Sequence, residues 1–416
     1  MTQEDTTHRC RLSFFAFLVL TAAVSFAAVA GSGGDTPHIV VIGEVQGSAA
    51  TVTKLLTHLG LADAQGHWAG GDTVLVQTGD LMDDGEHVRA VLDLFMRLQQ
   101  EAPAAGGQVI VLMGNHEAMN ILGELRDVNY LAFQSFAGPD SDTRQRKEFD
   151  EYVSWLQRRA KAVGSGEFVR NGNFEAEWLA THPVGWVEYV EAMGAEGKYG
   201  KWLRTLPVAA QYGEVVFIHA GISPEMKGMD VEAFNRRAAE EIAAFDRDRA
   251  SMVADGLCLP TSSAREMVTV VKEEINYLNS LDVSKRTPGN PRVARLLELQ
   301  DLTKWGSWSL LTDKGPLWFR GASKWDEKER GAEMAAILDT ADCGWMVTGQ
   351  SDGKEHFIHA RFDDRVLLTS VDMADDPWAG GGGAAALNIE NGVFTVITLN
   401  GREVLIDDQP DGNVQR

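Results

Sequence analysis

The chain has 416 residues, of which 44% are hydrophobic, and its formal net charge at pH 7 is −22. The length and apolar content suffice for one large domain or two modest ones. The negative charge disfavours nucleic acids and anionic membrane surfaces as partners, because both are bound through Lys and Arg. Solubility alone explains the same acidity equally well.

Residues 1–30 have the pattern of an export signal. Two arginines precede the apolar run Leu12–Ala30, which ends in the small residues that signal cleavage requires. We therefore expect a protein of the secretory pathway, secreted or lumenal. An uncleaved segment would instead anchor the chain in a membrane, because the run approaches the roughly 20 residues that span a bilayer.

The chain has three cysteines, Cys10, Cys258 and Cys343. Cleavage of the signal would remove Cys10. In an oxidising compartment the remaining two either form one disulfide or stay as two buried thiols, and the sequence does not choose between these alternatives.

Strand and helix patterns alternate in the first part of the mature chain, which indicates βαβ units and a parallel sheet. In chain order, the predicted elements are strand His38–Ile42, helix Ala49–Leu59, strand Thr73–Gln77, helix Glu86–Glu101 and strand Val109–Met113. A mostly helical insertion follows at about 129–204. We expect its tryptophans to anchor helices in a core rather than to form a binding surface; they are Trp155, Trp178, Trp186 and Trp202.

The second part of the chain repeats this alternation with a longer helical insertion. A strand at Val215–His219 precedes a helical stretch, Val231–Leu281, within an insertion of about 231–312. The predicted strands that close the chain are Gly344–Thr348, Glu355–Phe362, Val366–Ser370, Ala385–Ile389 and Val393–Thr398. We predict one α/β domain, residues 37–405, folded as a two-sheet α/β/β/α sandwich with both helical insertions.

Three polar motifs each follow a predicted strand, and they are GDLMDDG at Gly79–Gly85, GNHEAMN at Gly114–Asn120 and IHAG at Ile218–Gly221. Open α/β sheets hold their ligands at the ends of strands, so Asp80, Asn115 and His219 are expected to converge there. A carboxylate, an amide oxygen and an imidazole together suit a divalent metal such as Mn, Fe or Zn.

The order of these motifs, with GPLWFRG at Gly315–Gly321, resembles the calcineurin-like metallophosphoesterases, and in particular the Shewanella-like protein phosphatases, which are relatives of the phosphoprotein phosphatases. The resemblance runs from about Ile39 to about Thr398. It implies the two-sheet sandwich, a binuclear metal site and phosphatase activity.

The resemblance also implies a role for each matched residue of the site. Asp80 would bridge two metal ions, and Asn115 and His219 would bind the second ion. His116 would be the general acid that protonates the leaving oxygen, with Asp83 orienting its ring. Taken one at a time, Asp80, Asn115 and His116 are also explained as hydrogen-bonded turn residues.

Two arginines are candidates for binding the phosphate. Arg320 would hold a phosphate oxygen through charge-assisted hydrogen bonds, and Arg126 is a second candidate. The alternatives are an Arg320 stacked on Trp318 and an Arg126 that is a surface cation. We expect Glu117 to be a hydrogen-bonded structural partner rather than a metal ligand.

The chain departs from the family pattern at four positions. Glu44 and Gln46 replace a metal-binding Asp and His, Gln350 replaces a His of the second metal, and Asp84 replaces a phosphate-binding Arg. A neutral amide is a poor exchange for an imidazole at a transition metal. Glu44, Gln46 and Asp80 are then an all-oxygen set, which is better suited to Mg, Ca or Mn.

Two functions remain open on the sequence alone. The first is a metal-dependent phosphatase acting on a phosphoprotein or a small phosphate ester, with divalent ions, Mn or Fe/Zn with Mg as an alternative, in one or two sites. The second is an inactive pseudophosphatase that acts as a binding or scaffold protein. We favour the enzyme, because the acid His116 and its partner Asp83 are both retained.

Overall fold

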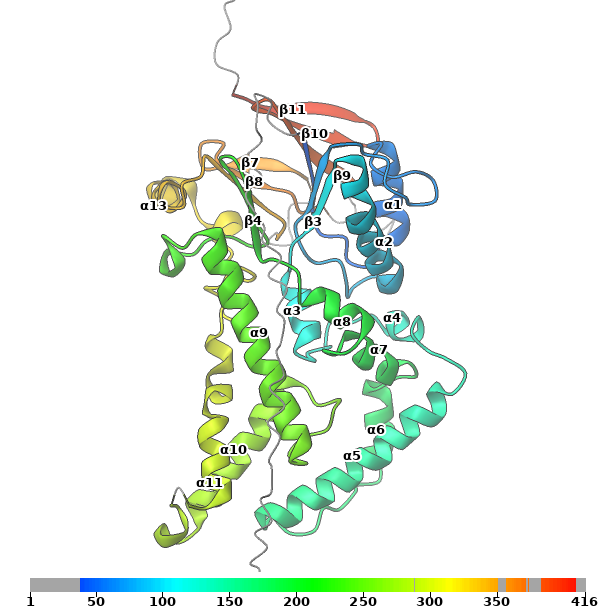
Figure 1. Ribbon diagram of the computed structural model, residues 1–416, viewed down its shortest axis with the longest axis vertical. Coiled ribbons are helices and arrows are strands. Elements are labelled where there is room, and N and C mark those ends of the chain that lie inside the picture. The colour runs from blue at the N-terminus through cyan, green and yellow to red at the C-terminus, as the bar shows by residue number, and fades with distance from the viewer. Residues whose placement is uncertain (1–37, 288, 351–356, 372, 374–382, 409–416) are drawn as a thin grey trace, which may run out of the picture.

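Two β-sheets form the centre of the protein in the computed structural model, which describes residues 38–287, 289–350, 357–371, 373 and 383–408. Figure 1 shows the sheets together at one end of the molecule, with α1 and α2 on one side and α13 on the other. The long insertion helices extend away from the sheets. This arrangement confirms the predicted sandwich of two sheets covered by helices.

The first sheet has the strand order β11-β10-β9-β1-β2-β3 over the described residues. Its strands are β1 (Ile39–Ile42), β2 (Val74–Gln77), β3 (Gln108–Val111), β9 (Ala385–Glu390), β10 (Val393–Thr398) and β11 (Gly401–Asp407). The first three are parallel, and the others are antiparallel to their neighbours. The parallel strands are joined through α1 (Ala49–His58) and α2 (Val88–Glu101).

The second sheet has the order β4-β5-β6-β8-β7 over the same described residues. Its strands are β4 (Ala209–Tyr212), β5 (Val215–Ile218), β6 (Trp345–Thr348), β7 (His359–Arg361) and β8 (Val366–Leu368). The three central strands, β5, β6 and β8, are parallel. Two helices, α12 (Gly321–Lys324) and α13 (Glu327–Thr340), precede β6.

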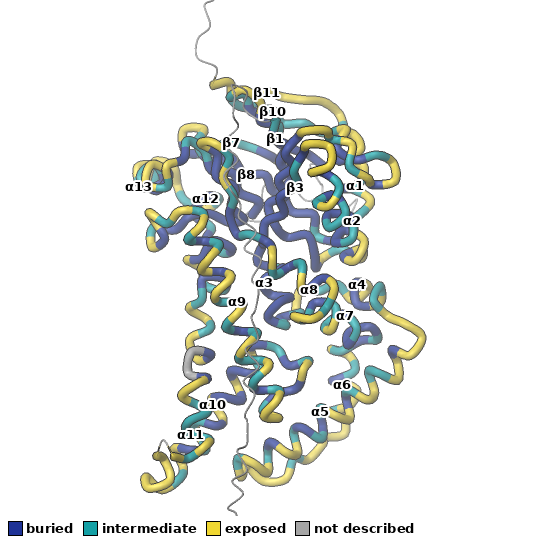
Figure 2. Tube along the Cα trace, in the orientation of Figure 1, coloured by how far each residue is buried: buried dark blue, intermediate teal, exposed yellow. Residues whose placement is uncertain are grey.

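The parallel strands consist almost entirely of apolar residues because both of their faces are covered. The sequences of β1 and β5, IVVI and VVFI, are buried at every position. Figure 2 shows this as dark blue tube through the centre of both sheets, whereas the insertion helices carry long exposed stretches. The core therefore lies between and around the sheets, and it fixes where the strands end.

The two insertions supply most of the remaining helices. The helix α3 (Asn115–Ile121) directly follows β3. The helices of the first insertion are α4 (Tyr130–Gln134), α5 (Ser141–Val163), α6 (Phe174–Thr181), α7 (Trp186–Met193) and α8 (Lys198–Leu203). Those after β5 are α9 (Val231–Ala254), α10 (Ala264–Ser280) and α11 (Pro291–Glu298). Short 3-10 helices are η1 (Ala102–Ala105), η2 (Pro224–Met226), η3 (Val283–Lys285) and η4 (Gln300–Ser307).

The two insertions pack against each other around a second hydrophobic cluster. This cluster joins Trp155 of α5 to Phe245 and Met252 of α9 and to Met267 and Val271 of α10. The indole nitrogen of Trp155 donates to a backbone carbonyl of the second insertion. Trp178 and Trp186 are also buried, and Trp202 packs partly buried against the main core. The tryptophans are thus core residues, as the sequence predicted.

A buried ion pair reinforces the same interface. The guanidinium of Arg159 in α5 lies 2.5 Å from Glu274 of α10, and Arg292 of α11 lies 2.6 Å from the other oxygen of Glu274. Arg159 and Glu274 are buried, whereas Glu273, which also pairs with Arg159, is about half exposed at 48%.

Several sequence predictions need correction. The stretch Val231–Leu281 is two helices, because the chain turns through Gly256 at φ +69° and Ser263 then caps α10 with a capping box. The strands β4 and β11 were not predicted, and β11 continues past the predicted boundary at residue 405. The predicted strand Glu355–Phe362 reduces to β7, while residues 355–356 lie outside the described part.

The two cysteines of the described part are both free and buried. Of the two alternatives left open by the sequence, the structure therefore supports separate buried thiols. Burial raises the pKa of Cys258 to about 12 and that of Cys343 to about 11, which makes both poor nucleophiles.

Within the described residues, none of the helices combines the length and the apolar character needed to cross a membrane. The predicted signal, residues 1–30, lies outside the described residues and stays a prediction.

The buried ion pair gives a direct test of how the insertions are held together. Glu274→Leu leaves Arg159 buried with only the exposed Glu273, and loss of one partner of a buried pair costs about 3–5 kcal/mol. We expect a loss of this size in urea unfolding followed by circular dichroism. Glu273→Gln is the control, with a loss of at most about 1 kcal/mol, because its pair is solvent-exposed. Equal losses in both variants would contradict the assigned role.

Candidate metal centre

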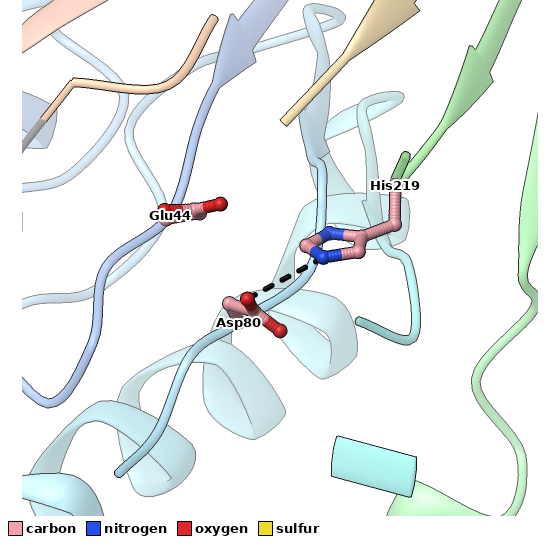
Figure 3. Close-up of side chains that lie close together, drawn as sticks. All are labelled: Glu44, Asp80 and His219. Atoms are coloured by element: carbon pink, nitrogen blue, oxygen red, sulfur yellow. Dashed lines mark ion pairs between the residues drawn. The ribbon is translucent and has the colours of Figure 1, made fainter. Parts of the chain in front are cut away.

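Five loops that follow strands of the two sheets meet at one edge. They contribute Glu44 after β1, Asp80 after β2, Asn115 after β3, His219 after β5 and Gln350 after β6. Figure 3 shows that Glu44, Asp80 and His219 point toward one another from three separate segments of the chain. One donor atom from each of these three lies within 4.8 Å of the other two, and all three residues are buried.

The loop that carries Asp80 is held by the carboxylate of Glu117. This carboxylate accepts hydrogen bonds from the backbone N–H groups of Asp80, Leu81 and Gly114, each at 2.8 Å. Glu117 is fully buried. It therefore joins the two loops of the site as a structural partner, which confirms the prediction for this residue.

Gly114 has to be a glycine because Asp80 passes so close to it. A Cβ on Gly114 would lie 2.1 Å from Oδ1 of Asp80. The same carboxylate oxygen accepts a hydrogen bond of 3.1 Å from the backbone N–H of His116. Asp80 itself has φ +58°, a left-handed backbone that is uncommon for a residue with a side chain. The loop conformation is thus set by packing against the next motif.

The ring of His219 is oriented by the backbone. Its Nδ1 lies 2.8 Å from the carbonyl oxygen of Thr78, so Nδ1 carries a proton and Nε2 faces the site. Nε2 lies 3.4 Å from Oδ2 of Asp80 and 2.9 Å from Oδ1 of Asn115. Two acceptor oxygens and a ring nitrogen therefore converge, an arrangement that requires a proton, an amide N–H or a metal ion between them.

Gln350 supplies such an amide next to Asn115. With its amide nitrogen turned toward the site, Gln350 donates to Oδ1 of Asn115 at 2.9 Å and to Nε2 of His219 at 3.2 Å. Its amide oxygen then accepts from Nη2 of Arg320 at 2.9 Å. In this arrangement an N–H group of Gln350 occupies the space between the ligand atoms that the sequence had assigned to the second metal.

Electrostatics favour a cation between Glu44 and Asp80. Burial, and then the charge of Asp80, raises the pKa of Glu44 to about 7. Burial would also raise the pKa of Asp80, but His219 and His116 lower it to about 2. Burial would lower the pKa of His219, but Asp80 raises it to about 9. Buried carboxylates in such proximity are stabilised by a bound cation.

The donor set fits one divalent ion. Two carboxylates and one oriented imidazole are ligands that Mn, Fe and Zn accept in proteins. The sequence had placed Glu44, Gln46 and Asp80 around the first metal. In the structure the amide nitrogen of Gln46 donates to Oε2 of Glu44 at 3.2 Å, and His219 completes the cluster with Glu44 and Asp80.

The His116 imidazole lies beside this cluster. Its Nδ1 is 2.6 Å from Oδ2 of Asp83, and its Nε2 is 3.9 Å from Oδ2 of Asp80. Its side chain is 14% exposed, whereas Asp83 is fully buried. Burial would lower the pKa of His116, but the charge of Asp80 and the hydrogen bond that His116 donates to Asp83 raise it to about 10. The ring therefore carries a proton at neutral pH and can donate it through Nε2.

The remaining predicted residues differ in how directly they contact the residues of the candidate metal centre. Arg320 is partly buried and reaches the site through Gln350. Arg126 is exposed; its Nη2 lies 3.7 Å from Sδ of Met119, and its Nε lies 3.4 Å from Asp127. Asp84 is exposed, and its backbone carbonyl accepts a hydrogen bond from Asn129 at 2.8 Å.

Three residues of the site were missed by the sequence reasoning. The hydroxyl of Ser370 donates to Glu44 at 3.3 Å. Asn120 contacts Asp83, and Tyr189 contacts Asn120. Of these three, only Asn120 could have been identified from the sequence, because it lies one helical turn after His116 on α3. Ser370 and Tyr189 are brought in by the tertiary structure alone.

Comparison with known proteins identifies a domain in the first part of the chain. Residues 37–223 match the calcineurin-like phosphoesterase family. The matched segment contains the strand-end motifs of Asp80, Asn115 and His219, so this part of the chain is similar to a calcineurin-like phosphoesterase domain.

Among individual proteins, the chain is similar to the Shewanella-like protein phosphatases. It is 27% identical over 221 residues to Shewanella-like protein phosphatase 2 of Arabidopsis thaliana, an alignment of 51% of this chain and 53% of that protein. It is 30% identical over 120 residues to Shewanella-like protein phosphatase 1 of Plasmodium berghei, covering 29% of this chain and 33% of the other. The chain thus aligns with about half or less of these relatives.

The fold has a counterpart among solved structures. The cold-active protein-tyrosine phosphatase of a psychrophilic Shewanella species superposes with a TM-score of 0.51 at 22% identity, covering 89% of this chain and 81% of the other. At this level of identity the match shows that the fold is shared.

The role of Glu117 leads to a stability prediction. Glu117→Ala leaves three buried N–H groups without an acceptor, and each unsatisfied group costs about 1–3 kcal/mol, so we expect a loss of at least about 3 kcal/mol in urea unfolding. Glu266→Ala is a matched control, because Glu266 accepts from one backbone N–H, that of Ser263. Its loss should be about 1 kcal/mol. A Glu117→Ala variant as stable as Glu266→Ala would refute the proposed anchoring.

Proposed function

We propose that this protein is a metal-dependent phosphatase that hydrolyses phosphomonoesters. The observation that carries this proposal is the His116–Asp83 pair, joined at 2.6 Å, next to the cluster of Glu44, Asp80 and His219. An acid that is protonated at neutral pH beside a divalent-ion site is the combination that ester hydrolysis needs. The match of residues 37–223 to the calcineurin-like phosphoesterase family supports the same reaction.

Glu44, Asp80 and His219 are the residues that would hold the metal ion. A bound divalent ion supplies Lewis acidity and lowers the pKa of a bound water. His116 donates its proton from Nε2 to the leaving oxygen of the ester. Asp83 accepts a hydrogen bond from Nδ1 and stabilises the charged ring before the transfer, which also fixes the direction in which Nε2 points.

Arg320 is the proposed phosphate-binding residue. A guanidinium matches two phosphate oxygens in a bidentate geometry, and Gln350 holds it at the site. Arg126 is a less favoured second candidate, since its contacts are with Met119 and Asp127. Asp84 opposes dianion binding where the family pattern has an Arg. The substrate is a phosphoprotein, with phosphoserine or phosphothreonine as candidates, or a small phosphate ester.

We further propose that the ion is Mn, Fe or Zn, with Mg as an alternative, and that one site is filled. The amide nitrogen of Gln350 lies against Asn115 and His219, so a second ion would have to displace it. Residues 1–30 would direct the protein into the secretory pathway. The net charge of −22 argues against a nucleic-acid partner.

The second candidate is an inactive pseudophosphatase that acts as a binding or scaffold protein. It is favoured by Gln46 and Gln350, which replace two imidazoles of the family pattern with amides. The loss of an imidazole ligand lowers metal affinity, and a site without its ion has no activated water. The two candidates therefore differ in a measurable property, metal-dependent turnover.

The test is metal analysis of the purified protein together with a phosphate-ester assay in Mg, Mn, Zn and Fe. We expect metal-dependent turnover, and His116→Ala should lower kcat by about 10²–10⁴-fold while metal content stays the same. His58→Ala, an exposed histidine at the end of α1, is the control and should behave as the wild type. Absence of bound metal and turnover equal to that of His116→Ala would favour the pseudophosphatase.

Restoring the family residues tests whether the substitutions limit the reaction. The variant Glu44→Asp, Gln46→His, Asp84→Arg and Gln350→His should bind two ions and turn over faster, by about tenfold or more, because two imidazoles that bind metal directly and the phosphate-binding Arg return. Metal stoichiometry and kcat measure the outcome. Two bound ions without a gain in kcat would show that metal ligation does not limit the rate.

A further inference from the structure

A chain of hydrogen bonds leads from the first insertion to the candidate acid. The hydroxyl of Tyr189 donates to Oδ1 of Asn120 at 2.7 Å, and Nδ2 of Asn120 donates to Oδ1 of Asp83 at 2.8 Å. The other carboxylate oxygen of Asp83 lies 2.6 Å from Nδ1 of His116. Tyr189, Asn120 and Asp83 are all buried.

Each bond in this chain fixes the direction of the next. An amide side chain can present either its oxygen or its nitrogen, and the Tyr189 hydroxyl selects the orientation in which the oxygen of Asn120 faces α7. Nδ2 then reaches Asp83 and also the backbone carbonyl of His116, at 2.9 Å. As a result both oxygens of the Asp83 carboxylate have a partner, and its plane is held.

Asp83 also has an unfavourable backbone conformation, which the surrounding contacts have to maintain. Its φ is +91°, a region that residues with side chains rarely occupy and that persists only where the surroundings impose it. Its carbonyl accepts from the backbone N–H of Asn129 at 3.0 Å. The Asn120 amide is the contact that fixes the carboxylate end of the residue.

Tyr189 is held rigidly at the start of the chain. It is fully buried in α7, and its ring contacts Phe133 and Phe136 edge-on, with centroids 5.0 Å away in both cases. Burial raises the pKa of Tyr189 well above its usual value, so its hydroxyl keeps the proton that it donates. Figure 1 shows α7 close to α3, the helix that carries Asn120 and His116.

We propose that Tyr189 and Asn120 are positioning residues of the reaction. They hold the Asp83 carboxylate so that the His116 ring presents Nε2 to the leaving oxygen, and the first insertion thereby aligns the acid. This inference rests on the proposed phosphatase function. In this step the oxygen of a water molecule forms a bond to phosphorus and gives up a proton to solvent, while the bond from phosphorus to the leaving oxygen breaks with its electron pair on that oxygen. The leaving oxygen takes the proton of Nε2, and the N–H electron pair stays on the His116 ring.

A second tyrosine of the same insertion provides a matched control. Tyr199 of α8 is also buried and also contacts Phe136, at a centroid distance of 5.7 Å. Its hydroxyl, however, donates to Asp93 of α2 at 2.9 Å, and among the described residues no chain of hydrogen bonds leads from it to His116. Replacement of either tyrosine by Phe removes one hydroxyl and keeps the ring.

The first experiment uses the leaving group as the readout, because proton donation matters most when the leaving oxygen is basic. In the full chain with Mn, Tyr189→Phe should lower kcat for phosphoserine by about tenfold and kcat for p-nitrophenyl phosphate by less than about twofold, with unchanged KM. Asn120→Ala should lower kcat for phosphoserine further. Tyr199→Phe should change neither substrate. Equal loss on both substrates, or the same loss in Tyr199→Phe, would overturn the inference.

The second experiment does not depend on turnover. In protein with ¹⁵N-labelled histidine, the Nδ1 proton of His116 should resonate far downfield, as expected for a bond to a buried carboxylate. Tyr189→Phe and Asn120→Ala should shift this resonance, and Tyr199→Phe should not. A wild type without turnover would remove the proposed function alone, whereas an unchanged resonance in Tyr189→Phe would remove the positioning role even in an active enzyme.

Discussion

The rest of the site depends on one constraint, which is that the carboxylates of Glu44 and Asp80 are both buried and lie next to each other. Two neighbouring buried carboxylates repel each other and lose their hydration, so the fold has to compensate for both effects. It does so with the oriented ring of His219 and with the loop geometry that Glu117 maintains. A divalent cation completes the compensation, and for this reason the site has the properties of a metal centre.

The helical insertions are part of the site as well as of the scaffold. They share a hydrophobic cluster and the buried Arg159–Glu274 pair, which ties one insertion to the other. Through Tyr189 the first insertion also reaches the acid. A change far along the chain can therefore alter the direction of the His116 ring without touching any metal-binding residue.

The substitutions in the metal-binding motifs change the site unequally. Glu44 keeps a carboxylate, and one of its oxygens lies within 4.8 Å of a donor atom of Asp80 and of a donor atom of His219. Gln46 and Gln350 instead turn their amide nitrogens toward neighbouring acceptors, Glu44 in one case and Asn115 with His219 in the other. His116 and Asp83, which match the family pattern, are joined by a hydrogen bond of 2.6 Å.

The sequence by itself determined the fold class, the strand ends and most of the polar residues placed there, because apolar runs of strand length followed by Asp80, Asn115 or His219 are local patterns. It missed β4 and β11, whose patterns are not strongly apolar, and it assigned Glu44 and His219 to different metal ions, whereas the structure groups both residues with Asp80. Only the tertiary structure decided that grouping, the turn of the Gln350 amide and the contact of Tyr189 with Asn120. Each of these depends on packing between segments far apart in the chain, and side-chain direction there is set by neighbours that no local pattern encodes.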